Sequence, residues 1–165
     1  MTKSLTKKLI AILGALLLMS AAVFADEPPA WLRQAAAVNL PTYGKEVRAV
    51  VLHDEANKKV EEDGRITTTT LWAVKILSRE GRGQASASES YNTGSGKIKE
   101  MRAWLIRPTG EVRSYGKKET VDMALADNDV YNDARMKRIS AADEADAGCV
   151  FGYEIITEER EVFSQ

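Results

Sequence analysis

The 165-residue sequence is poor in the residues that build metal centres and disulfide frameworks. It contains one cysteine and one histidine, which excludes a disulfide-stapled scaffold and a zinc site made of Cys and His ligands. It also lacks an excess of positive charge, because 23 Lys and Arg are balanced by 24 Asp and Glu. That balance argues against binding nucleic acid by phosphate neutralisation. With 44% hydrophobic and 28% charged residues, the composition is that of an ordinary globular domain, and it indicates no cofactor.

The N-terminus has no acidic residue before Asp26. A basic start is followed by an apolar stretch and then by small residues: Lys3, Lys7 and Lys8, residues 9–19, and Val23-Phe24-Ala25. This order predicts a secretory signal peptide over residues 1–25, cleaved near Ala25. An uncleaved membrane anchor and a buried helix are the alternatives, since the apolar stretch is short for a bilayer span.

Cleavage changes the charge and the compartment of the chain. Three lysines leave and no acidic residue does, so the mature chain carries 20 basic and 24 acidic residues, a net charge of −4. We expect it to be extracytoplasmic, either periplasmic or secreted. Its single cysteine, Cys149, would then be unpaired in an oxidising compartment.

The mature chain reads as a short helix followed by strands. Residues 26–47 form a lead-in segment in which Pro29 can open a helix over 31–38. Residues 48–165 are then rich in strand patterns, and they predict one β domain.

Two segments alternate most clearly between apolar and polar residues. One face of the first is Ile66, Thr68, Thr70, Trp72, Val74 and Ile76, and Asp63-Gly64 before it predicts a type I′ hairpin turn. The second runs over 98–107, with Met101, Ala103 and Leu105 on one face and Trp104 and Ile106 on the other. Weaker strands are expected over 85–91, 111–115, 136–139 and 149–156. Residues 117–131 read as a helical turn and a polar loop. The pattern predicts an antiparallel β-sandwich, mainly β, with one short N-terminal helix.

The order of these pieces resembles the DUF3857 family, an extracytoplasmic domain of unknown function. The resemblance spans residues 29–158 and rests on these segments: Pro29-Ala30-Trp31-Leu32, residues 49–53, Asp63-Gly64, Val74-Lys75-Ile76-Leu77 with Gly81, Lys97-Ile98, residues 103–111, Gly148, and Phe151-Gly152-Tyr153-Glu154. The Arg-Pro-x-Gly turn that follows the alternating strand is the most specific of them.

The resemblance implies a setting rather than a reaction. Domains of this family commonly stand between a signal peptide and a transglutaminase-like cysteine hydrolase domain, which supplies a Cys-His-Asp triad. Nothing in this sequence matches that domain, so no catalytic residue is carried over. Family members also continue past the position of Gln165 with further strands. We therefore expect the β domain to be truncated at its C-terminal end, with residues 149–156 left at or near a sheet edge.

Cys149 and His53 are the one cysteine–histidine pair that could act as a nucleophile and its base. Cys149 shares a face with Phe151, Tyr153 and Ile155, which favours a buried structural thiol. His53 lies beside Asp54 in the first strand and is expected on a surface or edge. The alternative, a small cysteine-dependent hydrolase, needs both residues in one site.

Two further features could bind ligands. Asp127, Asn128, Asp129, Asn132 and Asp133 form an acidic loop, but its spacing lacks the glycine and the terminal glutamate of an EF-hand, so a solvated loop is expected. Trp72 and Trp104 lie on strands, where core packing is the expected role. Exposed aromatic side chains on a sheet are also how modules grip peptides and glycans.

These observations predict an exported β module without catalytic, cofactor or metal residues. We expect it to accompany a transglutaminase-like domain, or to bind an extracytoplasmic peptide or glycan, through a sheet face or edge. A truncated remnant without independent function is the alternative from another class.

Overall fold

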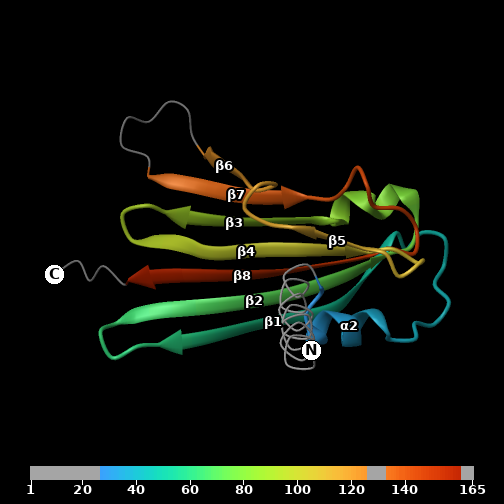
Figure 1. Cartoon of the computed structure of the whole chain (residues 1–165), viewed down its shortest axis with the longest axis horizontal. Coiled ribbons are helices and arrows are strands. Elements are labelled where there is room, and N and C mark those ends of the chain that lie inside the picture. The colour runs from blue at the N-terminus through green and yellow to red at the C-terminus, as the bar shows by residue number, and fades with distance from the viewer. Residues whose placement is uncertain (1–26, 126–132, 161–165) are drawn as a thin grey trace, which may run out of the picture.

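The computed structural model describes residues 27–125 and 133–160, which form a mainly β structure (Figure 1). The elements in chain order are α2 (Ala30–Ala36), β1 (Ala49–Val60), β2 (Arg65–Ile76), the 3-10 helix η2 (Arg79–Gln84), β3 (Ser86–Asn92), β4 (Gly96–Ile106), β5 (Val112–Tyr115), β6 (Val121–Ala124), β7 (Ala134–Ser140) and β8 (Val150–Arg160). The described strands pair antiparallel throughout. The expected fold class, two antiparallel sheets with one short N-terminal helix, is confirmed.

The strands divide into a five-stranded sheet, β1-β2-β8-β4-β5, and a three-stranded sheet, β3-β7-β6. β8 lies in the middle of the larger sheet and pairs with β2 on one side and with β4 on the other. The expectation that this strand would be left at or near an edge is wrong. β8 carries the apolar face of Phe151 and Ile155, and a central position buries that face more fully than an edge would.

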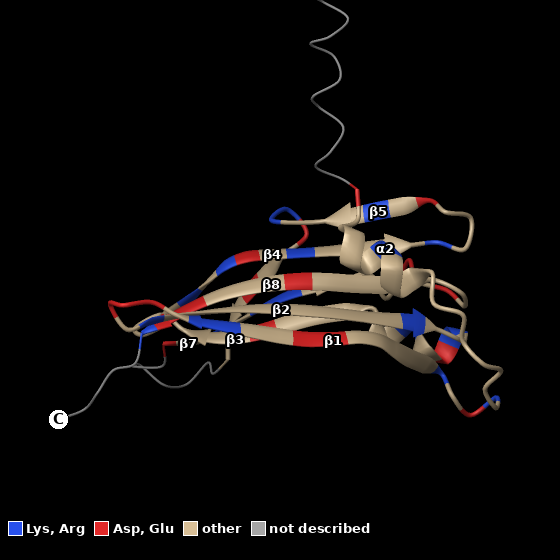
Figure 2. Ribbon diagram, turned by 90° about the horizontal axis from the view of Figure 1, so that it is seen from below, with Lys and Arg blue, Asp and Glu red and all other residues tan. Residues whose placement is uncertain are grey.

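Two apolar clusters hold the layers together. The larger lies between the two sheets and includes Phe151, Leu105 and Ile139. The smaller lies on the opposite face of the five-stranded sheet, where Leu32 and Ala35 of α2 pack on Ala73, Trp104 and Val150. Figure 2 shows the strands of the large sheet in order from β5 to β1, with α2 in front of the ends of β4 and β8. The two clusters place α2 on one face of this sheet and the small sheet on the other. The molecule therefore has three layers: a helix, a large sheet and a small sheet.

The predicted strand faces are confirmed. Val74 and Ile76 belong to the inter-sheet cluster, with Trp72 at its margin. In β4, Met101, Ala103 and Leu105 face the same cluster, while Trp104 and Ile106 face α2. Because strand side chains alternate with a period of two, the order of apolar residues decides these faces locally.

The β1–β2 turn differs from the prediction. Gly64 has φ of +78°, whereas Asp63 does not have a positive φ, and a type I′ turn requires positive φ at both central residues. The Gly64 N–H donates to the Glu61 carbonyl over 3.0 Å. The connection is therefore a type I turn that ends in a glycine bulge, a turn that asks for positive φ only at the glycine.

Smaller differences concern element ends and one strand. The helix begins at Ala30 with Pro29 as its N-cap, one residue before the predicted start. β6 lies within the segment predicted as a helical turn and loop. Its side chains are all exposed and give no apolar pattern, so the strand forms because its backbone pairs with that of β7. The predicted signal peptide, residues 1–25, and all of the acidic loop except Asp133 lie outside the described residues. Among the described helices, none is long and apolar enough to cross a membrane.

Candidate functional site: a groove at the open edge of β4

β4 is partnered unequally on its two sides. It pairs with β8 from Gly96 to Ile106, but with β5 only from Ala103 to Ile106. β5 is short because the chain turns away after Tyr115, where Gly116 begins a turn. Within the part of the chain that the structure describes, residues 98–102 of β4 thus have no strand beside them on the β5 side. An open edge of this kind presents backbone N–H and C=O groups to an incoming strand.

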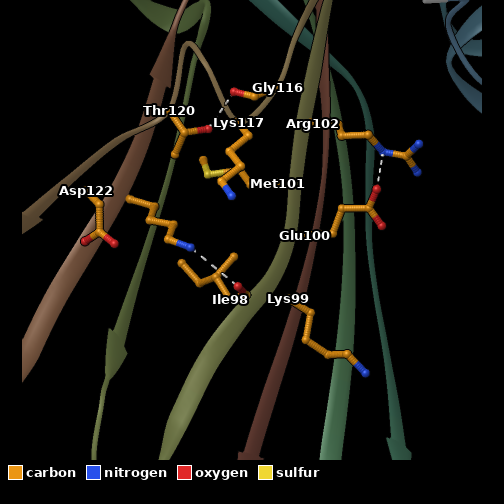
Figure 3. A pocket seen from close by; sticks show the side chains of 10 residues that line it. Ile98, Lys99, Glu100, Met101, Arg102, Gly116, Lys117, Thr120 and Asp122 are labelled. Carbon is orange, nitrogen blue, oxygen red and sulfur yellow. Dashed lines mark hydrogen bonds and ion pairs between the residues drawn. The ribbon is translucent and has the colours of Figure 1, made fainter. Parts of the chain in front are cut away.

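A cavity of about 620 Å³ runs along this edge. Residues 98–102 of β4 form one wall, and the other residues that line it are Gly116, Lys117, Thr120, Asp122 and Lys137. Figure 3 shows the side chains of Ile98, Met101, Lys117, Thr120 and Asp122 on the groove side of β4, and those of Lys99, Glu100 and Arg102 on the other side. We call this cavity the β4 groove.

A lysine side chain occupies part of the open edge. The Lys137 Nζ donates to the Ile98 carbonyl oxygen over 3.5 Å, and it lies 5.7 Å from the centre of the Tyr91 ring. The carbonyl is therefore bonded to a flexible ammonium, where a neighbouring strand would place a backbone N–H. A partner strand could displace this contact without breaking a backbone ladder.

The floor of the groove is set by an irregularity in β4. The pairing with β8 shifts between Ile98 and Glu100, so one extra residue is accommodated there, as in a β-bulge. As a result Ile98 and Met101 both point inward, with 6% and 7% of their surface exposed. The floor is apolar, and the wall above it is backbone.

The loop after β5 is held by its own hydrogen bonds. The Gly116 N–H donates to Glu119 Oε2 over 2.9 Å, and the Thr120 hydroxyl donates to the Gly116 carbonyl over 2.8 Å. These bonds keep Lys117 at the groove. Lys117 is exposed and has no ion pair among the described residues.

Asp122, the acidic side chain on the groove side of β4, is already engaged. Asp122 accepts hydrogen bonds from the Tyr91 hydroxyl at 2.8 Å and from Arg135 Nε at 2.9 Å. Partial burial opposes ionisation, but these two bonds hold the pKa of Asp122 below its usual value. The positive charges of Lys117 and Lys137 therefore dominate the unsatisfied charge of the groove.

The sequence-predicted nucleophile and base do not meet. Cys149 lies in the inter-sheet cluster with 1% of its surface exposed, and its Sγ accepts a hydrogen bond from the Asp146 N–H at 3.5 Å. His53 lies on the helix side of the large sheet, with its ring 5.2 Å from that of Trp31 and its Nε2 3.1 Å from Glu55 Oε2. The sheet separates the two side chains, so the structure does not bring Cys149 and His53 into one site.

The remaining candidates divide between core and surface. Trp104 is 3% exposed beneath α2, as expected for a core residue. Trp72 is only partly buried, and its ring stacks on that of Tyr153. Of the acidic loop, the described residue Asp133 is exposed. Within the described ranges no group of three His, Cys, Asp or Glu side chains is placed to hold a metal ion.

Sequence reasoning did not find the β4 groove. The available signal was a difference in length, because the alternating pattern over 98–107 is about twice as long as the returning segment 111–115. A long strand followed by a short partner leaves part of its edge open. What lies opposite that edge is decided by the position of β6 and β7.

Comparison with known proteins places the fold in a family. The structure is similar to a crystal structure from Parabacteroides distasonis, described as that of a candidate protease, with a TM-score of 0.62, 11% identity and coverage of 70% of this chain. The chain spans 24% of that protein's length. No curated protein matches the chain in sequence. The profile of DUF3857, a domain of unknown function that has solved structures, matches residues 62–164. The chain therefore belongs to the DUF3857 family, as the order of its segments indicates.

Proposed function

We propose that this protein is an exported, non-catalytic interaction module that binds an extended segment of a partner polypeptide in the β4 groove. The observation that carries the proposal is the open backbone edge of residues 98–102. It is open because β4 has 11 residues and its neighbour β5 has only 4. Adding a strand to such an edge is a common way to recognise peptides, because the backbone supplies hydrogen bonds and the flanking pockets supply specificity.

The charge of the groove favours an acidic segment. Lys117 has no ion pair among the described residues, and Lys137 is bound to a neutral carbonyl. Carboxylates at alternate positions of an added strand would lie on one face, where they could reach these two ammonium groups. Apolar residues at the other positions would meet Ile98 and Met101.

The partner that we propose is the enzyme domain that this module accompanies. Family resemblance suggests a transglutaminase-like hydrolase. The similar structure from Parabacteroides distasonis is described as a candidate protease, and the similarity covers 24% of it. A small shared portion of a larger chain supports the role of a module that works beside another domain.

The test uses a designed ten-residue peptide that alternates valine with glutamate, and its valine–lysine counterpart. Hydrogen exchange of the backbone amides of residues 98–102 is measured with each peptide. We expect the glutamate peptide to slow exchange at these amides and the lysine peptide to leave it unchanged. The outer strand β1 reports non-specific pairing, because it is the opposite edge of the same sheet.

Two pairs of variants make the test specific. A Cβ atom added at Gly116 or at Gly83 would meet no atom within 4 Å, and neither glycine has a positive φ. Gly116→Trp should fill the groove and abolish protection, whereas Gly83→Trp should not. Lys117→Gln should weaken the effect and Lys118→Gln, outside the groove, should not. If the glutamate peptide does not slow exchange at residues 98–102, or slows exchange equally over β1, the proposal is refuted.

A further inference from the structure

A second surface lies on the inner face of the large sheet. Trp72 of β2 and Tyr153 of β8 are directly opposite each other in the ladder, and Asp54 of β1 is opposite Trp72. Directly opposed residues point to the same face. The two rings stack with their centres 5.4 Å apart at an angle of 24°. Asp54, Trp72 and Tyr153 thus form one row across three strands, which we call the aromatic row.

The aromatic row is only partly covered. Trp72 and Tyr153 are partly buried at the margin of the inter-sheet cluster, and Asp54 is exposed. The small sheet stops short of β2, since its strand β3 contacts β4 and β8 instead. In Figure 1, β3 and β7 lie beyond β4 on the side away from β1 and β2. The small sheet therefore leaves the inner face of β2 near Trp72 only partly covered.

Two carboxylates flank the aromatic row and neither is neutralised. Asp54 stands at one end, and Glu89 of β3 approaches Tyr153 from the small sheet. Neither residue has an ion pair or a hydrogen bond with the described residues. Burial raises the pKa of Glu89, and the nearby carboxylate of Glu159 raises it further. Burial raises the pKa of Tyr153, as do Glu89 and Asp54.

The other face of the same strands is different. Glu158 of β8 lies 3.0 Å from Lys97, 3.3 Å from Lys99 and 3.4 Å from Arg65. Glu154 lies 3.4 Å from Arg102. Carboxylates that face outward on β8 therefore form ion pairs, whereas Asp54 and Glu89 form none among the described residues. Lys137 of β7 is opposite Glu89 in the ladder, but its Nζ donates to the Ile98 carbonyl instead.

We propose that the aromatic row binds the cationic side chain of a lysine or arginine from a partner polypeptide. The ammonium or guanidinium group would lie over the Trp72 ring, which attracts cations through its π face. Asp54 and Glu89 would supply the opposite charge from either side. Charge complementarity favours a cationic ligand, because two carboxylates without an ion pair lie beside a stacked aromatic pair. This surface is separate from the β4 groove and does not depend on it.

The test is titration with tri-arginine and tri-lysine amides, observed by NMR at the Trp72 indole. We expect the Trp72 indole signal to shift and to saturate with tri-arginine and with tri-lysine. We expect no such shift with triglutamate or with a neutral glucose trisaccharide. Asp54→Asn and Glu89→Gln should each weaken binding by about threefold to tenfold, the size of one charged or cation–π contact. Glu62→Gln removes the same charge at the exposed hairpin tip and should have little effect. Trp72→Leu should abolish binding. If Trp72→Leu does not fold, Asp54→Asn still tests the proposal.

The outcomes separate the explanations. Equal weakening by Asp54→Asn, Glu89→Gln and Glu62→Gln would show general electrostatic attraction and overturn the proposal. Binding of the neutral trisaccharide with the same shifts would instead assign the aromatic row to glycans. Gly116→Trp, which fills the β4 groove, should leave tri-arginine binding unchanged. The two proposed surfaces can therefore fail independently.

Discussion

Leu32 of α2 packs directly against the backbone of Gly152 in the central strand β8. Leu32 is fully buried, and a Cβ added at Gly152 would lie 2.9 Å from its Cδ2 and 3.2 Å from its Cγ. Gly152 is flanked in the ladder by Ala73 and Trp104. The missing side chain leaves the space that the leucine fills, so one contact attaches the helix layer to the sheet.

Gly152→Ala should therefore destabilise the protein. The added methyl group collides with Leu32, and overpacking of this kind typically costs about 1–3 kcal/mol of unfolding free energy. The cost is expected at the helix, so amide exchange over α2 should accelerate more than exchange over β8. Urea denaturation and hydrogen exchange measure both effects. Gly83→Ala is the matched control, because a Cβ there meets nothing within 4 Å.

Leu32→Ala should cost about 2–5 kcal/mol, since it removes a fully buried side chain. In the double variant with Gly152→Ala the methyl group enters the vacated space. The two losses should then be less than additive, as for residues in direct contact. If the two losses of unfolding free energy are additive, the contact between Leu32 and Gly152 does not attach α2 to the sheet.

Cys149 should be a structural residue. Cys149→Ala should lower the free energy of unfolding by about 0.5–3 kcal/mol, the usual range for a small buried change. The native thiol should react slowly with a thiol reagent and quickly once the protein is unfolded, because it is 1% exposed. Rapid labelling of the native protein, or loss of peptide binding with an unchanged melting curve, would contradict the structural role.

Tyr115 should make the protein sensitive to alkaline pH. Burial raises the pKa of Tyr115 to about 12 from an ordinary value of 10.0, and the nearby Glu144 carboxylate adds to the shift. A folded-state pKa above the unfolded value gives stability below about pH 10 that is lost as the pH rises through 12. Denaturation between pH 9 and pH 12 (about three units around the ordinary value) should show this loss.

Tyr115→Phe should flatten that dependence. The Tyr115 hydroxyl is buried without a hydrogen-bond partner in the described structure, so its removal should cost nothing at neutral pH. Tyr43→Phe changes an exposed tyrosine and is the control. A Tyr115→Phe variant that loses stability as steeply as the unchanged protein would refute the assignment.

Processing should remove residues 1–25. The protein recovered outside the cytoplasm is expected to begin at Asp26, and intact mass measures this directly. Ala25→Tyr should block cleavage, since signal peptidases require a small residue at that position. A mature mass that still includes the first 25 residues would contradict the signal-peptide interpretation.

Local pattern alone determined which side chains face which layer. The alternation of Trp72, Val74 and Ile76, and that of Met101, Ala103 and Leu105, predicted the inter-sheet face correctly. Cys149 was placed on the face of Phe151 for the same reason. Such predictions succeed because strand geometry repeats every two residues, so the faces follow from neighbours in sequence.

Tertiary structure decided where the strands lie and what their edges meet. The sequence by itself predicted an apolar strand over 149–156 but not that β8 would stand between β2 and β4. It could not separate buried Trp104 from partly exposed Trp72, since both lie on alternating strands. The β4 groove and the aromatic row depend on how far β5 and β3 reach across the large sheet. Pairings between distant segments are selected by the burial that the whole fold achieves, which local periodicity does not record.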